Sequence, residues 1–349
     1  MQRRDALKTL AALSLGASAT ARERPAGQPL GLVIHSYAVR SSKPLGPDFS
    51  PINDPLAFVE HAATLGAAGV QTRIGLPEAA AVDRLRAAVS RHGMYLEGIV
   101  ALPKDEDDAG RFEAELAAAR SAGAGVLRTV CLSGRRYETF DSRQAFDEFA
   151  RRSWKSLTLA EPIARRQQVR LAVENHKDWR VDEMLGWLKR LGSEHVGVCL
   201  DTGNSMALLE EPHAVVEAYA PWTMTTHLKD MGVQAYDDGF LLSEVPFGRG
   251  LLDLPRIVAT IGKARPDVKL NLEMITRDPL RVPCLTAGYW ATMPDVRASE
   301  LADSLARVRK ERFPGALPTV SDLSHVQQLQ AEAENIRNCL VFAEERLQG

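Results

Sequence analysis

The feature of this sequence that most constrains its fold is a repeated alternation of short apolar runs with longer segments of helical periodicity. Eight runs rich in β-branched and other apolar residues are predicted to be strands. They are Leu32–Tyr37, Val70–Ile74, Tyr95–Ala101, Val126–Leu132, Arg170–Asn175, Val196–Asp201, Met224–Leu228 and Lys269–Ile275. Because these runs are too apolar for a sheet with one face in water, the pattern favours parallel strands that are covered on both faces.

Segments with apolar residues at helical spacing lie between these strands. They are Leu56–Leu65, Ala80–His92, Phe112–Ala122, Phe146–Arg166, Met184–Leu191, Ala214–Tyr219 and Leu254–Ala264. Eight strand–helix units in series predict an α/β fold, a (β/α)8 TIM barrel over residues 30–276. A doubly wound open sheet is the alternative, and the lack of a glycine-rich phosphate loop after the first strand disfavours it.

Residues 277–349 form a longer tail than closing a barrel requires. The stretch Arg277–Pro283 has the composition of a loop, and Tyr289 and Trp290 follow it. Val326–Leu347 has the periodicity of a helix and is predicted to pack on the outside of the barrel. We therefore expect a lid loop and a C-terminal helical extension that belong to the same domain.

The first 21 residues have the layout of an export signal. Arg3 and Arg4 precede an apolar run of small residues from Thr9 to Ala19, and Ala17–Ala19 offers a cleavage site. The paired arginines favour the twin-arginine (Tat) route, which predicts the Tat export machinery as a partner and a periplasmic or secreted location. A short amphipathic first helix is the alternative. The run is too short to span a bilayer, so no stable membrane insertion is expected.

The balance of charges argues against a nucleic-acid partner. The chain has 43 Lys and Arg residues against 45 Asp and Glu residues, a formal net charge of −2. Proteins that bind nucleic acids do so chiefly through an excess of positive charge near the phosphates. The four cysteines are widely scattered without a C-x-x-C pair, and we assign them to packing. A homodimer is compatible with the sequence.

Acidic and histidine residues are predicted at the carboxyl ends of four consecutive strands. Glu174, Asp201, His227 and Glu273 each end an apolar run. Because the active sites of TIM barrels lie at this end of the strands, we expect the four side chains to converge. Three carboxylates and an imidazole would repel one another and lose hydration unless a cation compensated them. Such a set suits one divalent ion, namely Mn²⁺, Mg²⁺, Co²⁺ or Zn²⁺.

This set of residues resembles the sugar phosphate isomerase/epimerase branch of the xylose isomerase-like TIM barrels. That branch includes ketose 3-epimerases and inosose-handling enzymes, and endonuclease IV is a distant relative. The resemblance extends from Leu30 to Ile275 and is most specific in Val173–His176, Leu200–Asn204, His227–Asp230 and Pro246–Asp253. It implies that Glu174, Asp201, His227 and Glu273 are the metal ligands. It also implies that Glu174 and Glu273 exchange protons with the reacting carbon from opposite faces.

Two positions depart from the family pattern. Asn204 stands where the family often has a histidine, and Arg249 stands where it often has an acid. These departures concern the substrate and the reaction rather than the metal.

Further polar residues near the strand ends are candidates for catalysis or for substrate binding. His176 follows Glu174 by two positions and Lys229 follows His227 by two, so each pair points to the same side of its strand. We take His176 and Lys229 as further catalytic candidates. The candidate substrate-binding residues are His35, Tyr37, Lys177, Asn204, Arg249, Arg277 and Trp290. An ordinary position in the core or in a solvated loop is the alternative for the residues around the metal ligands.

The leading hypothesis is a metal-dependent isomerase or epimerase that transfers a proton next to the carbonyl of a sugar or keto-sugar. A lyase or hydrolase that eliminates the substituent of a 3-oxo-glycoside is a close variant. An endonuclease IV-like phosphodiesterase would need more ligands on strands two to four, where Glu97 is the only acid. A non-catalytic carbohydrate-binding barrel is the third class, and a complete ligand quartet disfavours it.

Overall fold

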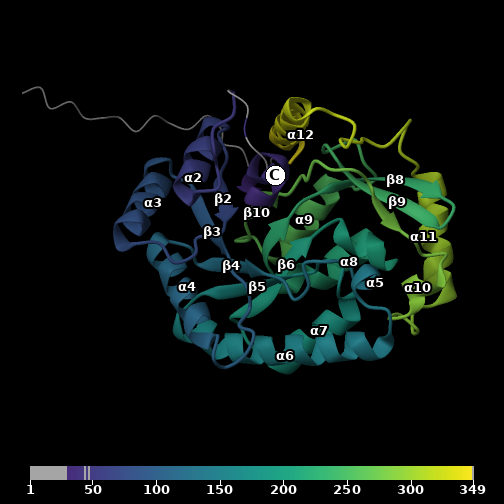
Figure 1. The fold of residues 1–349 in the computed structure, drawn as a ribbon, viewed down its shortest axis with the longest axis horizontal. Coiled ribbons are helices and arrows are strands. Elements are labelled where there is room, and N and C mark those ends of the chain that lie inside the picture. Colours follow the sequence, from purple (N-terminus) through teal and green to yellow (C-terminus); the bar gives the residue numbers. More distant parts are fainter. Residues whose placement is uncertain (1–29, 43–44, 46–47, 348–349) are drawn as a thin grey trace, which may run out of the picture.

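Eight parallel strands form the central sheet of the protein. The computed structural model describes residues 30–42, 45 and 48–347, so the expected export signal lies outside the described residues. The strand order is β10-β1-β2-β3-β4-β5-β6-β7. The bounds are Leu30–Val33 (β1), Gly69–Thr72 (β2), Tyr95–Ile99 (β3), Val126–Thr129 (β4), Arg170–Glu174 (β5), Val196–Asp201 (β6), Thr223–His227 (β7) and Leu270–Leu272 (β10). Backbone hydrogen bonds from Leu228 N to Asn271 O and from Glu273 N to Leu228 O connect β7 with β10. The sheet therefore closes, and the predicted TIM barrel is confirmed (Figure 1).

Helices surround this barrel (Figure 1). The α-helices are α1 (Ala38–Ser42), α2 (Pro55–Thr64), α3 (Ala79–Arg91), α4 (Ala109–Ala122), α5 (Arg136–Thr139), α6 (Arg143–Arg166), α7 (Val181–Leu191), α8 (Pro212–Tyr219), α9 (Leu254–Ala264), α10 (Ala287–Trp290), α11 (Ala298–Lys310) and α12 (His325–Arg346). Short 3₁₀ helices are η1 (Ile34–Tyr37), η2 (Asn204–Leu208) and η3 (Ala220–Trp222). Helix α3 packs between α2 and α4, and α4 also contacts α6. Helix α8 packs between α7 and α9 in the same way. The buried strands are thus covered on their outer side.

Local sequence signals explain where the long helices begin. The side chains of Asp54, Ser142, Asp253 and Ser324 accept hydrogen bonds from the first turns of α2, α6, α9 and α12. Proline occupies the first turn of α2, α8 and α9, where no intrahelical N–H bond is lost. Helix α7 ends at Gly192, which has a φ of 60°, the left-handed conformation that often terminates a helix.

The insertion after β7 is a small antiparallel sheet that the sequence pattern did not predict. β8 (Asp230–Tyr236) and β9 (Gly239–Val245) form a hairpin, and β11 (Leu280–Val282) pairs with β9. β11 lies in the segment that we expected to be a lid loop. Part of the expected loop is therefore a strand, and backbone hydrogen bonds hold it to the hairpin.

The first strand is also shorter than predicted, and the C-terminal helix packs beside its end. Ile34–Tyr37 forms η1 instead of continuing β1. α12, the expected helical extension, contacts α1 and η1 on the barrel's outside. Glu332 of α12 accepts hydrogen bonds from Val39 N at 2.7 Å and Arg40 N at 3.1 Å. These bonds satisfy two N–H groups of the short helix α1, so α12 holds the loop after β1 in place.

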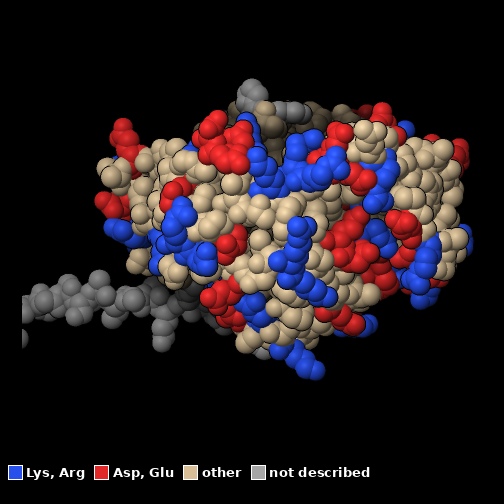
Figure 2. All heavy atoms as spheres, turned by 90° about the horizontal axis from the view of Figure 1, so that it is seen from below, with Lys and Arg blue, Asp and Glu red and all other residues tan. Residues whose placement is uncertain are grey.

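Basic and acidic side chains lie next to each other on the face that α6 helps to form (Figure 2). Arg143 and Asp147 of α6 form one of its ion pairs, at 2.7 Å. Over the residues that the structure describes, no helix combines the length and the apolar character needed to cross a membrane.

Candidate metal centre and active site

The four ligand-type residues meet at the carboxyl end of the barrel. Glu174, Asp201 and His227 are the last residues of β5, β6 and β7, and Glu273 directly follows β10. The register pairs Asp201 with His227 across β6 and β7, which sets these two side by side. One potential ligand atom from each of the four lies within 4.8 Å of the others, and all four side chains are buried. The parallel barrel thus brings together the residues that the sequence pattern singled out.

The two ring nitrogens of His227 have different surroundings. Nε2 lies 2.7 Å from the amide oxygen of Gln71, which can only accept, so Nε2 carries a hydrogen and donates it. Nδ1 has no hydrogen-bond partner and lies 3.4 Å from Glu174 Oε2 and 3.3 Å from Glu273 Oε1. Burial would lower the pKa of His227, but Cys199, Glu273 and Glu174 raise it well above its usual value, so the space between Nδ1 and the two carboxylates favours a cation, either a proton or a metal ion. This nitrogen and the three carboxylates fit one divalent ion.

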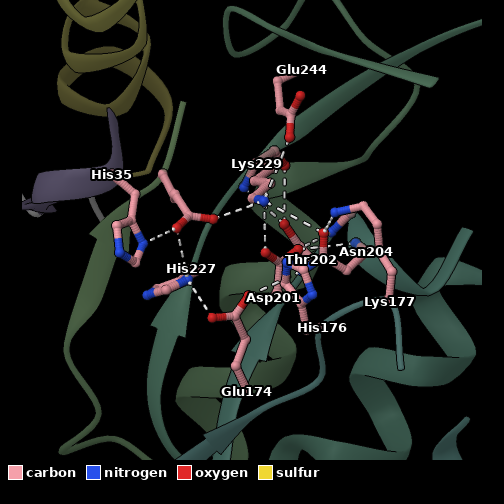
Figure 3. A network of polar contacts seen from close by, with 12 residues as sticks. His35, Glu174, His176, Lys177, Asp201, Thr202, Asn204, His227, Lys229 and Glu244 are labelled. Atoms are coloured by element: carbon pink, nitrogen blue, oxygen red, sulfur yellow. Dashed lines mark hydrogen bonds and ion pairs between the residues drawn. The ribbon is translucent and has the colours of Figure 1, made fainter. Parts of the chain in front are cut away.

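Lys229 contributes positive charge to the same cluster, and Figure 3 shows its side chain at the centre of the polar network. Its Nζ forms ion pairs with Glu273 Oε2 at 2.7 Å and with Asp201 Oδ2 at 2.9 Å. Burial alone would lower the pKa of Lys229, but Asp201 and Glu273 raise it well above its usual value. Lys229 is therefore protonated at neutral pH, so it suits donation to an oxyanion and not the role of a base.

Arg128 is a site residue that the sequence pattern did not reveal. It lies on β4, inside a run that reads as an ordinary strand, and its Nε donates to Glu174 Oε2 at 2.6 Å. A second guanidinium nitrogen contacts the same oxygen. On the other side, Asn204 Nδ2 donates to Glu174 Oε1 at 3.1 Å. Burial would raise the pKa of Glu174, but Arg128 and His227 hold it well below its usual range.

Glu244 is the second residue that was missed, because it comes from the hairpin insertion. It is buried on β9, and Arg277 donates from Nε to Glu244 Oε2 at 3.1 Å and from Nη2 to Oε1 at 2.5 Å. Burial would raise the pKa of Glu244, but Arg277 and Lys229 lower it to about 2. Lys177 donates to Asn204 Oδ1, and burial together with the charge of Lys229 lowers the pKa of Lys177 to about 8. The small sheet thus completes the charge balance of the site.

Two histidines lie at the edge of this network. His35 of η1 contacts Glu273 Oε1 through Nδ1 at 2.9 Å. Ser36 of η1 connects this short helix to the end of β10. Its hydroxyl donates to Leu272 O and accepts from Met274 N, both at 3.1 Å. His176 Nδ1 lies 3.1 Å from Gly134 O and donates to it, which leaves Nε2 as an acceptor. Burial and the charge of Lys177 lower the pKa of His176 to about 3, so its ring is neutral at neutral pH.

The structure places three of the expected substrate-binding residues away from the cavity at the barrel mouth. Tyr37 is buried against Phe58, and its hydroxyl contacts His61 Nε2 at 3.0 Å. Trp290 donates from its indole nitrogen to Cys284 O at 3.0 Å and does not line the cavity. Arg249 is exposed in the loop after β9 and lies outside the lining as well. The structure therefore places Tyr37, Trp290 and Arg249 outside the lining of this cavity, unlike the other expected site residues that it brings together.

The Pro246–Gly250 loop that contains Arg249 has a structural role instead. The Asp230 carboxylate accepts hydrogen bonds from the backbone N–H groups of Gly248, Gly250, Leu252 and Met231 at distances from 2.8 to 3.1 Å. This explains why an aspartate follows Lys229 and why glycines recur in the loop. A Cβ on Gly250 would lie 2.1 Å from Asp230 Oδ1, so the close approach requires glycine there.

A cavity of about 710 Å³ opens above the cluster. Its floor includes Glu174, His176, Lys177, Lys229 and Glu273. Its other side is lined by residues that follow β2, β3 and β4 and by one face of α6. Sites that bind small molecules commonly have volumes in the range of several hundred Å³, so the cavity is large enough for a sugar.

Comparison with known proteins agrees with this geometry. The family profile described as "Xylose isomerase-like TIM barrel" matches residues 59–310. A 3-oxo-isoapionate decarboxylase of Pectobacterium atrosepticum is 26% identical over 242 residues, which cover 66% of this chain and 80% of that protein.

Solved structures share the fold at lower identity. A 3-keto-D-glucoside 4-epimerase of E. coli has a TM-score of 0.55 and 14% identity, covering 81% of this chain and 99% of that one. A xylose isomerase-like TIM barrel protein of Mycobacterium smegmatis was determined in complex with magnesium. It has a TM-score of 0.51 and 15% identity, and the match covers 80% of this chain and 98% of that one.

Proposed function

This chain is an enzyme of the xylose isomerase-like TIM barrel family, and from that premise we propose that it is a metal-dependent isomerase or epimerase of a sugar or keto-sugar. The observation that carries the proposal is the orphaned Nδ1 of His227, which faces the carboxylates of Glu174 and Glu273 inside the buried quartet. A divalent ion held by Glu174, Asp201, His227 and Glu273 would polarise a substrate carbonyl and lower the cost of the neighbouring enediolate.

The side chains around the quartet have separable roles in this proposal. Glu273 removes or returns the proton on the carbon next to the carbonyl, and Glu174 does so from the other face. The ammonium of Lys229 donates to the oxyanion that develops. His176 Nε2 and Lys177 line the cavity and hold substrate hydroxyls by accepting and donating, respectively. His35 and Arg128 orient Glu273 and Glu174 through the contacts described above.

Decarboxylation of a 3-oxo acid is the second candidate, and the related decarboxylase favours it. In that reaction the bond to the carboxylate breaks, CO₂ leaves, and the electron pair passes into an enolate. A proton is then delivered to the same carbon. The two candidates share oxyanion stabilisation and proton delivery, and they differ in whether a proton or CO₂ leaves first.

We expect purified protein with Mg²⁺ to exchange the proton next to the carbonyl of its substrate in D₂O. NMR would follow deuterium incorporation into a panel of ketoses and 3-oxo-glycosides, with EDTA-treated protein as the control. Exchange or epimer formation that EDTA abolishes would support the isomerase or epimerase. If no compound exchanged while a 3-oxo acid released CO₂, the second candidate would replace the first.

A further inference from the structure

The cavity has two chemically different sides. The ligand quartet lies on β5, β6, β7 and after β10, whereas Arg73 follows β2, Lys104 follows β3 and Arg152 lies on α6. These three basic residues all line the cavity opposite the quartet. Among the residues that line it, Glu174 and Glu273 are the only acids. A substrate seated at the quartet therefore extends toward a basic wall.

The basic wall of Arg73, Lys104 and Arg152 differs from Arg128, Lys229 and Arg277, which also line the cavity, in lacking ion pairs with acidic side chains. Arg128 and Lys229 are neutralised by the quartet carboxylates, and Arg277 is neutralised by Glu244. Within the described residues, the side chains of Arg73 and Arg152 form no hydrogen bond or ion pair with the protein. The backbone N–H of Lys104 donates to Asp108 Oδ2 at 3.0 Å, and Arg111 pairs with the same oxygen at 2.7 Å, so this carboxylate is paired with Arg111. All three residues are exposed at the rim of the cavity, where like charges attract an anion most strongly at low salt.

We propose that Arg73, Lys104 and Arg152 form a subsite for an anionic group of the sugar substrate, either a carboxylate or a phosphate. The arginines offer paired N–H donors that match both groups, and the lysine adds a point charge. The subsite assigns an acidic sugar to the reaction and thus rests on the proposed function. It places the anion across the cavity from the reacting carbon, where it orients the substrate without entering the quartet.

Calorimetric titration of the Mg²⁺-loaded protein tests the subsite with three probes: glucose, gluconate and glucose 6-phosphate. We expect an acidic probe to bind more tightly than glucose, and salt to weaken only the acidic probe. Arg152→Gln or Arg73→Gln should raise the Kd of that probe about tenfold, the scale of one lost charged hydrogen bond, and leave glucose unchanged. The control is Arg151→Gln, which changes an exposed neighbour outside the cavity lining.

The outcomes separate the subsite from the proposed function. Preference for gluconate identifies a carboxylate site, and preference for glucose 6-phosphate identifies a phosphate site. Binding of neither acidic probe above the level of glucose, or equal Kd values in wild type and both variants, would overturn the subsite. Tight, arginine-dependent binding without deuterium exchange in any acidic sugar would count against the proposed function alone.

A separate observation concerns the interior of the barrel below the quartet. Gln71 is buried between His227 and Glu97, and its Nε2 donates to Glu97 Oε2 at 3.0 Å. The same oxygen accepts from Thr225 Oγ1 at 2.6 Å and from Asn271 Nδ2 at 3.0 Å. Glu97 Oε1 has no partner, so a proton on Glu97 would reside there and leave Oε2 an acceptor. Three donors thus converge on an oxygen that accepts in either protonation state.

This arrangement determines which nitrogen of His227 is available as a ligand. Because Glu97 Oε2 accepts, the amide of Gln71 must turn its NH₂ group toward Glu97 and its oxygen toward His227. That oxygen accepts the hydrogen on Nε2 and leaves Nδ1 with a lone pair toward the quartet. We infer that Gln71 and Glu97 are positioning residues that set the tautomer of His227 for metal binding.

Metal affinity tests this inference with a matched pair of variants. Gln71→Met keeps the side-chain size but removes the acceptor, and we expect the Kd for Zn²⁺ to rise by about 10–100-fold. In Gln71→Glu, the new carboxyl group shares a proton with Glu97 on one side and keeps an oxygen that accepts from His227 Nε2 on the other. The Kd of this variant for Zn²⁺ should stay within a few-fold of wild type. Equal Kd values for Gln71→Met and wild type would overturn the inference.

A measurement on the wild-type protein covers the case in which Gln71→Met does not fold. In the zinc-loaded protein, ¹⁵N-resolved NMR of the imidazoles should show a slowly exchanging hydrogen on Nε2 of His227, because Gln71 binds it. A hydrogen on Nδ1 instead, or rapid exchange at Nε2, would equally contradict the assigned tautomer.

Discussion

Replacing Glu273 with glutamine lowers turnover by about 10² or more, the usual scale for losing a general base. Glutamine keeps the shape and one oxygen that can bind a metal, so we expect metal affinity to fall only modestly. The amide cannot remove a proton, however, and it loses the charge that pairs with Lys229 at 2.7 Å. Steady-state rates and metal titrations on the same preparation would separate the two effects.

The matched variant is Glu174→Gln on the opposite side of the quartet. If both glutamates exchange protons, each variant should retain solvent exchange with one substrate epimer and lose it with the other. Loss of exchange with both epimers in Glu273→Gln alone would indicate a single base, as an isomerase or a decarboxylase requires. Near-wild-type turnover in both variants would show that the two carboxylates only hold the ion.

Removing the imidazole of His227 lowers metal affinity and turnover together. Loss of a residue that only hydrogen-bonds to a metal ligand typically weakens metal binding by about 10–100-fold. We expect His227→Ala, which removes a ligand itself, to weaken metal binding by more than this. The reason is that the variant deletes the one neutral donor of the quartet and leaves three carboxylates to share the ion. Titration of metal-free protein with Mn²⁺ or Zn²⁺ would give stoichiometry and affinity.

His195→Ala is a suitable control for this experiment. His195 precedes β6 at the opposite end of the barrel, and its Nδ1 contacts Val169 O at 3.1 Å. We expect this variant to bind one ion as the wild type does. Equal affinity in His227→Ala and in the wild type would remove His227 from the ligand set.

The barrel could be predicted from the sequence because each unit contains its own signals. β6 has the predicted bounds Val196–Asp201, and α9 has the predicted bounds Leu254–Ala264. Several other helices begin up to one turn before their predicted starts. α6, for example, begins at Arg143 after the capping Ser142, whereas its apolar periodicity is visible only from Phe146.

The quartet was predictable for a topological reason. In a closed parallel barrel all strands end at one rim, so residues that end different strands must converge whatever the loops do. Arg128 and Glu244 were not predictable in this way. Their roles depend on which partners the fold places beside them, and these are 46 positions from Arg128 and 33 positions from Glu244 in the sequence. Local patterns contain no information about such distances.

The β8–β9 hairpin shows a further limit of sequence patterns. Its first strand begins directly after Lys229, in a segment between the seventh predicted strand and the predicted helix Leu254–Ala264 to which the sequence pattern assigned no element. The Asp238-Gly239 dipeptide at its turn is a hairpin signal, but it marks the turn without showing which sheet the strands join.

The bond between α12 and the loop after β1 has a consequence for how the protein matures. Glu332 lies 293 positions after Val39, and Leu270 of β10 lies 240 positions after Leu30, its partner on β1. The first strand therefore has one early partner, β2, whereas its pairing with β10 and the support from Glu332 both come from distant, later segments. Nascent chains that are cut short before β10 lack Glu273 and the support for His35 at the same time. The metal site that we propose and the closure of the barrel are thus completed by the same segment, which contains β10 and Glu273.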